Sequence, residues 1–244
     1  MQLSVIIPTF NEEENILALL QHLRENADDH LNEIIVADGQ STDKTREEAE
    51  KTGVKVLRCP QRGRAAQMNH AAALATGDVL YFVHADTMPP TSYLQDIAQG
   101  LYEGYMLGGY RSEFATDNPL FRVNAWFTRF SLGYSYGGDQ TLYVDRQLFN
   151  QLNGFSEKHV IMEDFDFVRR ARKVADFKKI PKNALISTRK YDNNSFLRVS
   201  IANFIVFSMY RLGASPHYLK NTYQKLLNMP DSKKTSKSVL TQVK

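Results

Sequence analysis

Short apolar runs rich in β-branched residues alternate with longer segments of mixed polarity between Leu3 and Val83. This alternation is typical of βαβ units and predicts a parallel sheet. Strands are expected at Leu3–Pro8, Glu33–Ala37, Lys55–Arg58 and Asp78–Val83. The helices that connect them are expected near Glu12–Glu25, Thr42–Thr52 and Ala65–Thr76.

The alternation loosens after Pro90, and the second half of the chain is expected to be mixed rather than doubly wound. Helices are predicted near Ser92–Glu103, Pro119–Ser131, Arg146–Leu152 and Glu163–Val174. Strands are predicted near Leu107–Phe114 and Gln140–Val144, with two further short strands on either side of Pro181.

The C-terminal part differs from the rest in its pattern. Residues 194–227 look helical and amphipathic, and the tail from Met229 is polar and rich in Lys and Ser. The apolar residues at the start of this segment are expected to share one broad face: Phe196, Val199, Ile201, Phe204, Ile205, Phe207 and Met209. We therefore expect a main domain over residues 1–192, an amphipathic helical segment over 193–228 and a disordered basic tail over 229–244.

Composition narrows the class of protein. With 244 residues, 43% of them hydrophobic, the chain can bury one substantial core, and a net charge of +3 is too small to indicate a nucleic-acid partner. The single cysteine, Cys59, excludes an internal disulfide framework and is expected to be buried. The start of the chain lacks the pattern of a signal peptide, and the apolar run Ile201–Tyr210 is too short to cross a bilayer. A cytoplasmic protein without a transmembrane helix is expected.

Polar residues follow the first two predicted strands. Pro8 ends the first strand and is followed by Thr9, Asn11 and Glu12, and the second strand ends in Ala37-Asp38-Gly39. The carboxyl ends of parallel strands meet at one edge of a sheet, so Thr9, Glu12 and Asp38 are expected to line a crevice that hydrogen-bonds a base and a ribose. For the first cluster, capping of the next helix by Thr9 or Asn11 is the simpler alternative.

The third and fourth units bring basic and acidic side chains to the same edge. Arg62, Arg64 and Asn69 lie near the start of the third helix, where guanidinium groups and helix amides favour phosphate oxygens; a solvated basic turn is the alternative. His84 and Asp86 follow the fourth strand. A carboxylate there can hold Mg²⁺ or Mn²⁺ against a diphosphate, or it can simply cap the next helix.

These motifs resemble the glycosyltransferase family 2 enzymes of GT-A fold, which open with a strand ending in Pro-Thr-Phe-Asn-Glu-Glu like Val5–Glu13 here. Asp38–Asp43 resembles the family's nucleotide-binding segment, and Asp86 matches the last acid of its Asp-Xaa-Asp motif. His84 stands where the family usually carries the first acid, as in a bacterial subgroup with His-Ala-Asp. The resemblance implies an α/β GT-A fold, in which a mixed, mostly parallel central sheet is flanked by helices and followed by C-terminal amphipathic helices.

The resemblance also implies an activity, that of an inverting glycosyltransferase that moves a sugar from a nucleotide-diphosphate donor, most often UDP-linked, to a hydroxyl acceptor. It assigns donor binding to residues of the shared edge: Pro8, Thr9, Asn11, Glu12, Asp38, Arg62, Arg64, Asn69, His84 and Ala85. Asp86 is expected to ligate Mn²⁺ or Mg²⁺, but a neutral imidazole at His84 weakens the negative charge that holds a hard cation.

Three carboxylates stand close together in Met162–Asp166, at a predicted helix start. Acids are favoured in a first helical turn without any catalytic role. The resemblance implies that Asp164 is the base that removes the proton from the acceptor hydroxyl, on the face of the sugar opposite the diphosphate, with Glu163 supporting it. A single such carboxylate distinguishes this arrangement from the paired acids of glycosidases.

The sugar or acceptor pocket is expected to draw on the less patterned half of the chain, through Gly109, Trp126, Gly138, Asp139, Gln140 and Arg189. The glycines of Tyr136–Gln140 allow close approach of backbone to ligand, with a plain hairpin turn as the alternative. Arg122, Trp126 and Arg129 have helical spacing that suits an acceptor groove or a half-buried surface stripe. Arg189 is also a candidate for a diphosphate contact, and the missing Gln-Xaa-Xaa-Arg-Trp signature of processive members predicts a single transfer.

Several alternatives stay open at this point. The C-terminal segment suits packing on the core, a homodimer, or contact of residues 195–228 with the inner face of a membrane, where a lipid-linked acceptor would be found. A sugar nucleotidyltransferase is one rival function, although its basic glycine-rich loop is replaced here by the acidic Phe10–Glu13. The other rival is a membrane-associated module that binds sugar nucleotides without catalysis.

Overall fold

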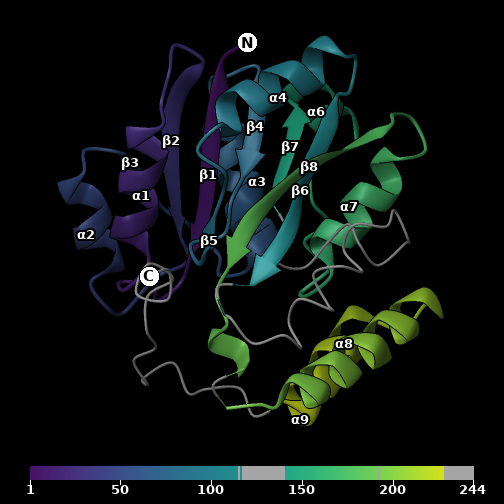
Figure 1. Ribbon diagram of the computed structural model, residues 1–244. Helices are drawn as coiled ribbons and strands as arrows, with labels where there is room; N and C mark the ends of the chain where they lie inside the picture. The colour runs from purple at the N-terminus through teal and green to yellow at the C-terminus, as the bar shows by residue number, and fades with distance from the viewer. Residues whose placement is uncertain (115, 117–140, 192, 228–244) are drawn as a thin grey trace.

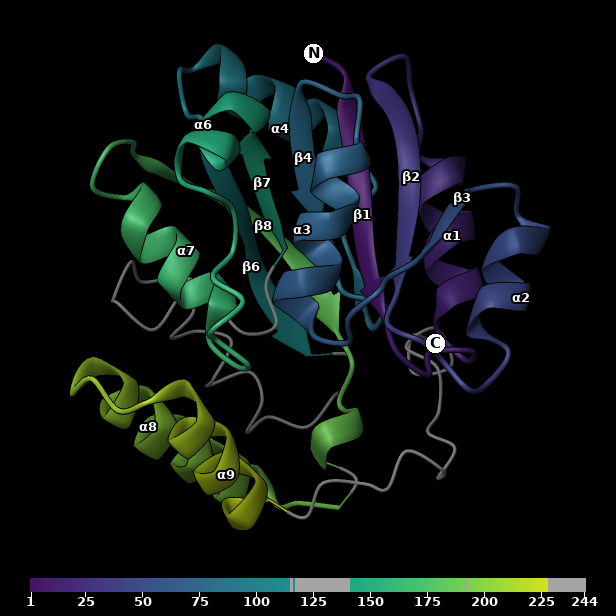
Figure 2. The ribbon, with the colours of Figure 1, turned by 180° about the vertical axis from the view of Figure 1, so that it is seen from behind.

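The chain forms an α/β structure around one central sheet. The computed structural model describes residues 1–114, 116, 141–191 and 193–227. Within these residues, eight strands form a sheet in the order β3-β2-β1-β4-β7-β6-β8-β5, with helices on both faces (Figures 1 and 2). The expected flanked sheet is confirmed.

The N-terminal half is a parallel βαβ array. The strands are β1 (Leu3–Thr9), β2 (Leu31–Asp38), β3 (Lys55–Arg58) and β4 (Val79–Phe82). The helices that join them are α1 (Ile16–Glu25), α2 (Thr45–Lys51) and α3 (Arg64–Leu74). Thr9 pairs with Asp38, and Asp38 pairs with Arg58, so the carboxyl ends of three strands are level with one another. The four predicted strands are confirmed.

The second half adds antiparallel strands, as the loosened pattern predicted. Its strands are β5 (Thr87–Met88), β6 (Leu107–Phe114), β7 (Leu142–Asp145) and β8 (Phe177–Ile186). Its helical elements are α4 (Tyr93–Tyr102), α6 (Arg146–Gln151), α7 (Glu163–Ala171) and the 3₁₀ helix η1 (Arg189–Tyr191). β7 runs antiparallel to both β4 and β6, whereas β8 runs parallel to β6.

The two short strands expected on either side of Pro181 are a single strand, β8. Tyr110 pairs with Ile180, and the next residue, Arg111, pairs with Asn183. The register shift leaves Pro181 and Lys182 out of the pairing, so the missing proline N–H costs no ladder hydrogen bond. The strand continues through the proline because the irregularity absorbs it.

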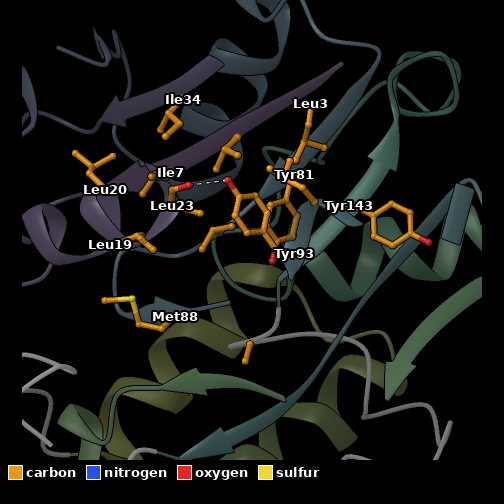
Figure 3. Close-up of a cluster of buried hydrophobic side chains, with 14 of the residues drawn as sticks. Leu3, Ile7, Leu19, Leu20, Leu23, Ile34, Tyr81, Met88, Tyr93 and Tyr143 are labelled. Carbon is orange, nitrogen blue, oxygen red and sulfur yellow. Dashed lines mark hydrogen bonds between the residues drawn. The ribbon is translucent and has the colours of Figure 1, made fainter. Parts of the chain in front are cut away.

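Alternate residues of the central strands divide between two cores. Leu3, Val5 and Ile7 of β1 face α1 and α4, whereas Ile6 faces α3, α6 and α7. Figure 3 shows the first core, in which Tyr81 and Tyr93 stack with their ring centroids 6.0 Å apart. The Tyr93 hydroxyl donates a 2.9 Å hydrogen bond to the Leu23 carbonyl, which satisfies the polar end of a buried ring. The two cores pack against the sheet and thereby fix the position of its carboxyl edge.

The C-terminal segment forms two antiparallel helices, α8 (Phe196–Arg211) and α9 (Pro216–Leu226). Gly213 between them has φ 82°, a left-handed conformation that favours glycine. The expectation of one broad apolar face is wrong, because Val199, Ala202, Val206 and Phe207 are buried while Leu197, Ile201 and Phe204 are exposed. Across the described helices, none is both long and apolar enough to cross a bilayer.

Candidate functional site

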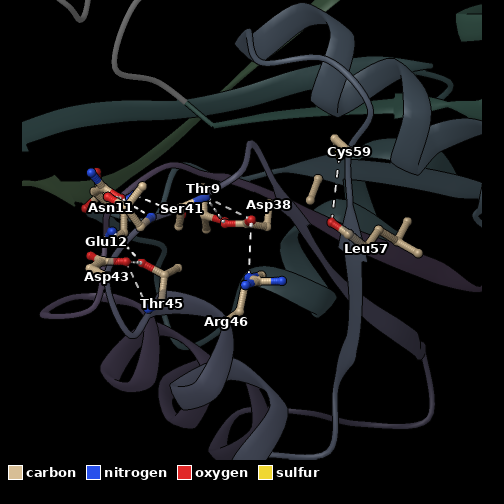
Figure 4. Close-up of polar contacts among 12 residues, drawn as sticks. Thr9, Asn11, Glu12, Asp38, Ser41, Asp43, Thr45, Arg46, Leu57 and Cys59 are labelled. Carbon is tan, nitrogen blue, oxygen red and sulfur yellow. Dashed lines mark hydrogen bonds and ion pairs between the residues drawn. The ribbon is translucent and has the colours of Figure 1, made fainter.

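Asp38 is the last residue of β2, at the edge of the sheet where the carboxyl ends of β1 and β2 are level. Its side chain is completely buried. Its carboxylate accepts a hydrogen bond from the Ser41 backbone N–H at 3.0 Å and one from the Thr9 hydroxyl at 3.5 Å. The Arg46 Nε atom lies 3.8 Å from the same carboxylate (Figure 4). Thr9 and Asp38 therefore form a hydrogen-bonded polar cluster at this edge of the sheet.

The loop after β1 is joined to the loop after β2. The Asn11 side-chain oxygen accepts a hydrogen bond from the Thr42 backbone N–H at 2.8 Å, and the Glu12 backbone N–H donates to the Thr45 hydroxyl at 2.8 Å (Figure 4). Helix α1 begins only at Ile16, and its N-cap residue makes no side-chain capping bond. The alternative in which Thr9 or Asn11 caps this helix is therefore wrong, because Thr9 bonds Asp38 at the end of β2 and Asn11 bonds the loop after it.

Gln67 links the ends of β1 and β2 to helix α3. This residue was not identified from the sequence. Its buried side-chain amide donates to the carbonyls of Thr9 at 2.8 Å and Ala37 at 2.7 Å. A Cβ atom on Gly39 would lie 2.7 Å from the Gln67 Oε1 atom, so a larger residue there would have to displace the Gln67 amide. The only signal for this contact in the sequence was the polar amide of Gln67 among the small residues of an otherwise apolar helix face.

Arg189 lies between the acids of two different loops. Its guanidinium makes two hydrogen bonds to the Glu12 carboxylate, at 2.6 and 3.0 Å, and lies 3.7 Å from the Asp86 carboxylate. Burial raises the pKa of Glu12, and the neighbouring Arg189 opposes that shift. Arg189 was expected in the sugar or acceptor pocket or at the diphosphate, and it lies against Glu12 and Asp86 of the predicted donor edge.

The described acidic side chains at this edge are too few to hold a metal ion by themselves. Within the described ranges, no group of three or more His, Cys, Asp and Glu side chains is positioned to hold a metal ion. Magnesium, however, usually binds through one or two carboxylates together with substrate phosphates and water. The Asp86 side chain is 32% exposed and faces the guanidinium of Arg189. It therefore fits a cation that takes its remaining ligands from a diphosphate.

The basic residues of the third loop do not converge on one point. The Arg62 guanidinium lies 3.4 Å from the centre of the Phe10 ring, in a cation–π contact. Arg64 reaches across to Glu163, and the Asn69 side chain exchanges hydrogen bonds with the Phe155 backbone at 2.9 Å. Arg64 and Asn69 therefore connect the N-terminal half to the loop and helix that follow α6.

The two candidate catalytic acids open helix α7. Met162 before them has φ 67°, a left-handed conformation that is uncommon for residues other than glycine and is often found at functional sites. Glu163 is only 1% exposed, and its carboxylate lies 2.8 Å from the Arg64 Nε atom. Burial raises the pKa of Glu163 to about 7, partly opposed by Arg64 and increased by the charge of Asp164.

Asp164 is more exposed than Glu163, and its carboxylate accepts a 2.8 Å hydrogen bond from the Phe165 backbone N–H at the start of the helix. This partly exposed carboxylate at the helix start is accessible to a ligand. The site thus has a buried acid tied to an arginine and an accessible acid beside it.

A sequence-family comparison identifies the chain. The model described as "Glycosyl transferase family 2" matches residues 4–171. The chain belongs to this family.

Individual relatives support the family assignment over shorter stretches. A dolichol-phosphate mannosyltransferase from Pyrococcus furiosus is 36% identical over 110 residues, which cover 43% of this chain and 31% of that protein. The match therefore spans about a third of the length of that relative.

Solved structures of glycosyltransferases share the fold. A Pyrobaculum calidifontis mannosyltransferase in complex with GDP-Man and Mn²⁺ has a TM-score of 0.65 and 20% identity, covering 91% of this chain and 68% of that one. A Mycobacterium tuberculosis glucosyl-3-phosphoglycerate synthase with Mn²⁺, UDP and glucosyl-3-phosphoglycerate has a TM-score of 0.57 and 18% identity, covering 95% and 81%. The family 2 chain described here therefore has the GT-A fold.

Other family-based expectations lie partly outside the described residues, where Trp126, Gly138, Asp139 and Gln140 are found. Gly109 is described, and it lies within β6, where a Cβ atom would collide with the Thr141 carbonyl oxygen. Close strand packing accounts for this glycine, and its contact with a sugar stays a prediction. His84 is partly exposed and Ala85 is buried, both directly before Asp86.

Proposed function

We propose that this family 2 protein is an inverting glycosyltransferase that moves one sugar from a nucleotide-diphosphate donor to a hydroxyl acceptor. The observation that carries the proposal is the Arg64–Glu163 ion pair, which joins the start of α3, on the N-terminal half that bears Asp38 and Asp86, to the helix start bearing Asp164. A donor at the edge would then present its sugar toward Asp164.

The donor is proposed to bind across the carboxyl ends of β1, β2 and β4, which is where open α/β sheets bind nucleotides. Thr9 and Asp38 supply polar groups for the base and ribose. Arg189 suits the diphosphate, because a guanidinium can donate two parallel hydrogen bonds to phosphate oxygens. A diphosphate would replace the Glu12 carboxylate as its partner.

A divalent cation, Mn²⁺ or Mg²⁺, is proposed to bind at Asp86 together with the donor. Such a cation would neutralise charge on the diphosphate leaving group. Arg189 lies 3.7 Å from Asp86 and already compensates its charge, so a cation has to compete with this arginine. Two of the neighbouring structures contain Mn²⁺, one with GDP-Man and the other with UDP. The base carried by this chain's donor is proposed to be uracil.

Asp164 is proposed as the catalytic base. Its carboxylate takes the proton of the acceptor hydroxyl as the oxygen forms a bond to the anomeric carbon. The bond from that carbon to the diphosphate breaks on the opposite face, and its electron pair leaves with the diphosphate, which inverts the configuration. Glu163 is less suited to this step because it is buried against Arg64, and we assign it the role of positioning the helix start.

The acceptor is proposed to be lipid-linked and reached at a membrane surface. The exposed Leu197, Ile201 and Phe204 of α8 support this, because they form an apolar strip at helical spacing next to basic residues such as Arg198. A single transfer is proposed, because the chain lacks the signature of processive members.

Nucleotide titration tests the donor part of the proposal. UDP, GDP, CDP and dTDP are added to the purified protein with and without Mn²⁺, and thermal stability is followed. A nucleotide at a hundred times its dissociation constant should add ~2.7 kcal/mol of apparent stability. We expect one nucleotide to stabilise the protein and Mn²⁺ to strengthen its effect.

Asp86→Ala is the matched variant for the cation. We expect it to lose the Mn²⁺-dependent part of the stabilisation, whereas Asp29→Asn, an exposed acid outside the site, should retain it. Stabilisation by no nucleotide in either condition would contradict the proposed donor site. Full Mn²⁺ stimulation in Asp86→Ala would place the cation elsewhere.

A further inference from the structure

A cavity of about 840 Å³ lies between the loop before α7, the outer face of α7, the end of α8 and the start of α9. None of the residues that line it was part of the sequence-derived site. Its walls come from segments far apart in the chain: Lys158, His159, Phe165, Val168, Arg169, Arg172, Phe207, Tyr210, Arg211, Gly213, Ala214, Ser215 and Pro216. The cavity is large enough for a small-molecule substrate or a headgroup.

The polar part of this wall is basic. Lys158, Arg169, Arg172 and Arg211 line the cavity, and no acidic side chain is among its described lining residues. Asp166 pairs with Arg169 at 2.7 Å, but it also pairs with Arg170 at 2.8 Å. The wall therefore carries more positive than negative charge and favours an anion.

The rest of the wall is aromatic and holds α8 against α7. The Phe165 and Phe207 ring centroids are 5.5 Å apart, and the Tyr210 hydroxyl accepts a hydrogen bond from Arg169 Nε at 3.2 Å. The His159 and Tyr210 ring centroids are 6.2 Å apart. Apolar surface beside the cations lowers the local dielectric constant and strengthens their attraction for an anion.

The cavity adjoins the proposed base. Phe165, which directly follows Asp164, is part of its wall. The charges of Asp164 and Asp166 also contribute to the raised pKa of Tyr210, whose main cause is burial. An anion held in the cavity would therefore lie near the first turn of α7, which also carries the proposed base.

We infer that this cavity binds a phosphate group of the acceptor, so that a hydroxyl of the same molecule reaches Asp164. This inference rests on the proposed function, since it concerns the acceptor of that reaction. Guanidinium and ammonium groups are the usual ligands of phosphate oxygens, and four of them face this cavity. A soluble phosphate monoester and a membrane lipid with the same headgroup share this chemistry.

Two probes distinguish these sources. Glycerol 3-phosphate is titrated into the full chain by calorimetry, and binding to phosphatidylcholine vesicles with and without phosphatidic acid is measured by co-sedimentation. The test variant is Arg172→Gln/Arg211→Gln, which removes two charges from the wall. The control is Arg24→Gln/Lys173→Gln, which removes two exposed charges that do not line the cavity.

We expect wild-type protein and the control to bind one of the two probes, and the test variant to bind it roughly tenfold or more weakly. Binding of glycerol 3-phosphate identifies a soluble acceptor, and binding confined to phosphatidic acid vesicles identifies a lipid acceptor. Equal affinity of test and control variants, or binding of neither probe by wild type, overturns the inference.

Nucleotide titration of the same variants separates this outcome from failure of the proposed function. The test variant should be stabilised by the preferred nucleotide as wild type is. If wild type responds to no nucleotide, the proposed function fails while the phosphate result stands by itself. If nucleotides bind normally and phosphate affinity is unaffected by the test variant, only the cavity assignment fails.

Discussion

The contacts of Arg189 balance the charges of two acids at the edge proposed to bind the donor. Its guanidinium binds Glu12 through two hydrogen bonds and lies 3.7 Å from Asp86. Two acids facing each other across a buried position would repel, and the arginine between them removes that repulsion. The same guanidinium is suited to a diphosphate, so ligand binding would exchange one anionic partner for another.

Replacing Arg189 tests this exchange. Arg189→Gln should weaken binding of the preferred nucleoside diphosphate by roughly 1.5–3 kcal/mol, because charge-assisted hydrogen bonds are lost. Binding of the matching nucleoside should change much less, since it carries no phosphate. Calorimetric titration with both ligands measures the difference, and Arg24→Gln on the exposed face of α1 is the control. Equal losses for nucleoside and diphosphate would contradict the assignment.

Glu163 gives the folded protein a pH dependence with a defined sign. Its pKa is raised by burial from 4.5 to about 7 in the folded chain. Between these values the folded state binds more protons than the unfolded state, so the free energy of unfolding falls as pH rises through this window. The buried carboxyl is thus better tolerated in its neutral form.

Glu163→Gln should flatten that dependence, because an amide does not titrate. Urea unfolding of wild type and variant at several pH values from 4.5 to 7 measures the effect. Wild type should lose stability toward the upper end of the window relative to the variant. Parallel stability curves for the two proteins would show that Glu163 titrates normally.

At the scale of elements, the ends of β1 and β2 are joined to α3 by one side chain. The Gln67 amide donates to a carbonyl at the end of each strand and is buried among apolar neighbours. Without it, the Ala37 carbonyl would lose this donor and the Thr9 carbonyl would keep the Gly39 backbone N–H, which lies 2.8 Å away. The relative position of these strand ends depends on this contact.

Gln67→Leu should therefore lower the free energy of unfolding by roughly 1–3 kcal/mol, because a buried acceptor loses a hydrogen-bond donor. Gln99→Leu, at an exposed position of α4, should change stability by less than about 0.5 kcal/mol. Chemical denaturation of both variants gives the comparison. A loss as small as that of the control would show that water replaces the amide.

The elements themselves followed largely from local pattern, and the differences have physical causes. Lys55–Arg58 and Leu107–Phe114 were predicted as the structure has them, because runs of β-branched and apolar residues between turns are strong signals. Helix α1 begins later than expected because the loop before it binds the loop after β2. β8 was predicted as two strands because the register shift that absorbs Pro181 depends on its partner strand.

At the scale of the whole molecule, the site combines two halves that meet only through tertiary contacts. The family motifs located Asp38, Asp86 and Asp164 in the sequence, but the Arg64–Glu163 pair joins residues 99 positions apart. No local pattern encodes such a pairing. The positions of α8 and α9, and the basic cavity they form with α7, were equally beyond prediction because aromatic contacts between distant segments create them.

Asp164 is proposed to accept a proton in a sugar-transfer reaction. The most direct test measures release of nucleoside diphosphate from the sugar donor of the preferred nucleotide, with water as acceptor, for wild type, Asp164→Asn and the control Asp29→Asn. We expect Asp164→Asn to lower the rate by about 10²–10⁴-fold while nucleotide affinity stays unchanged, and Asp29→Asn to behave as wild type. An undiminished rate in Asp164→Asn would contradict it.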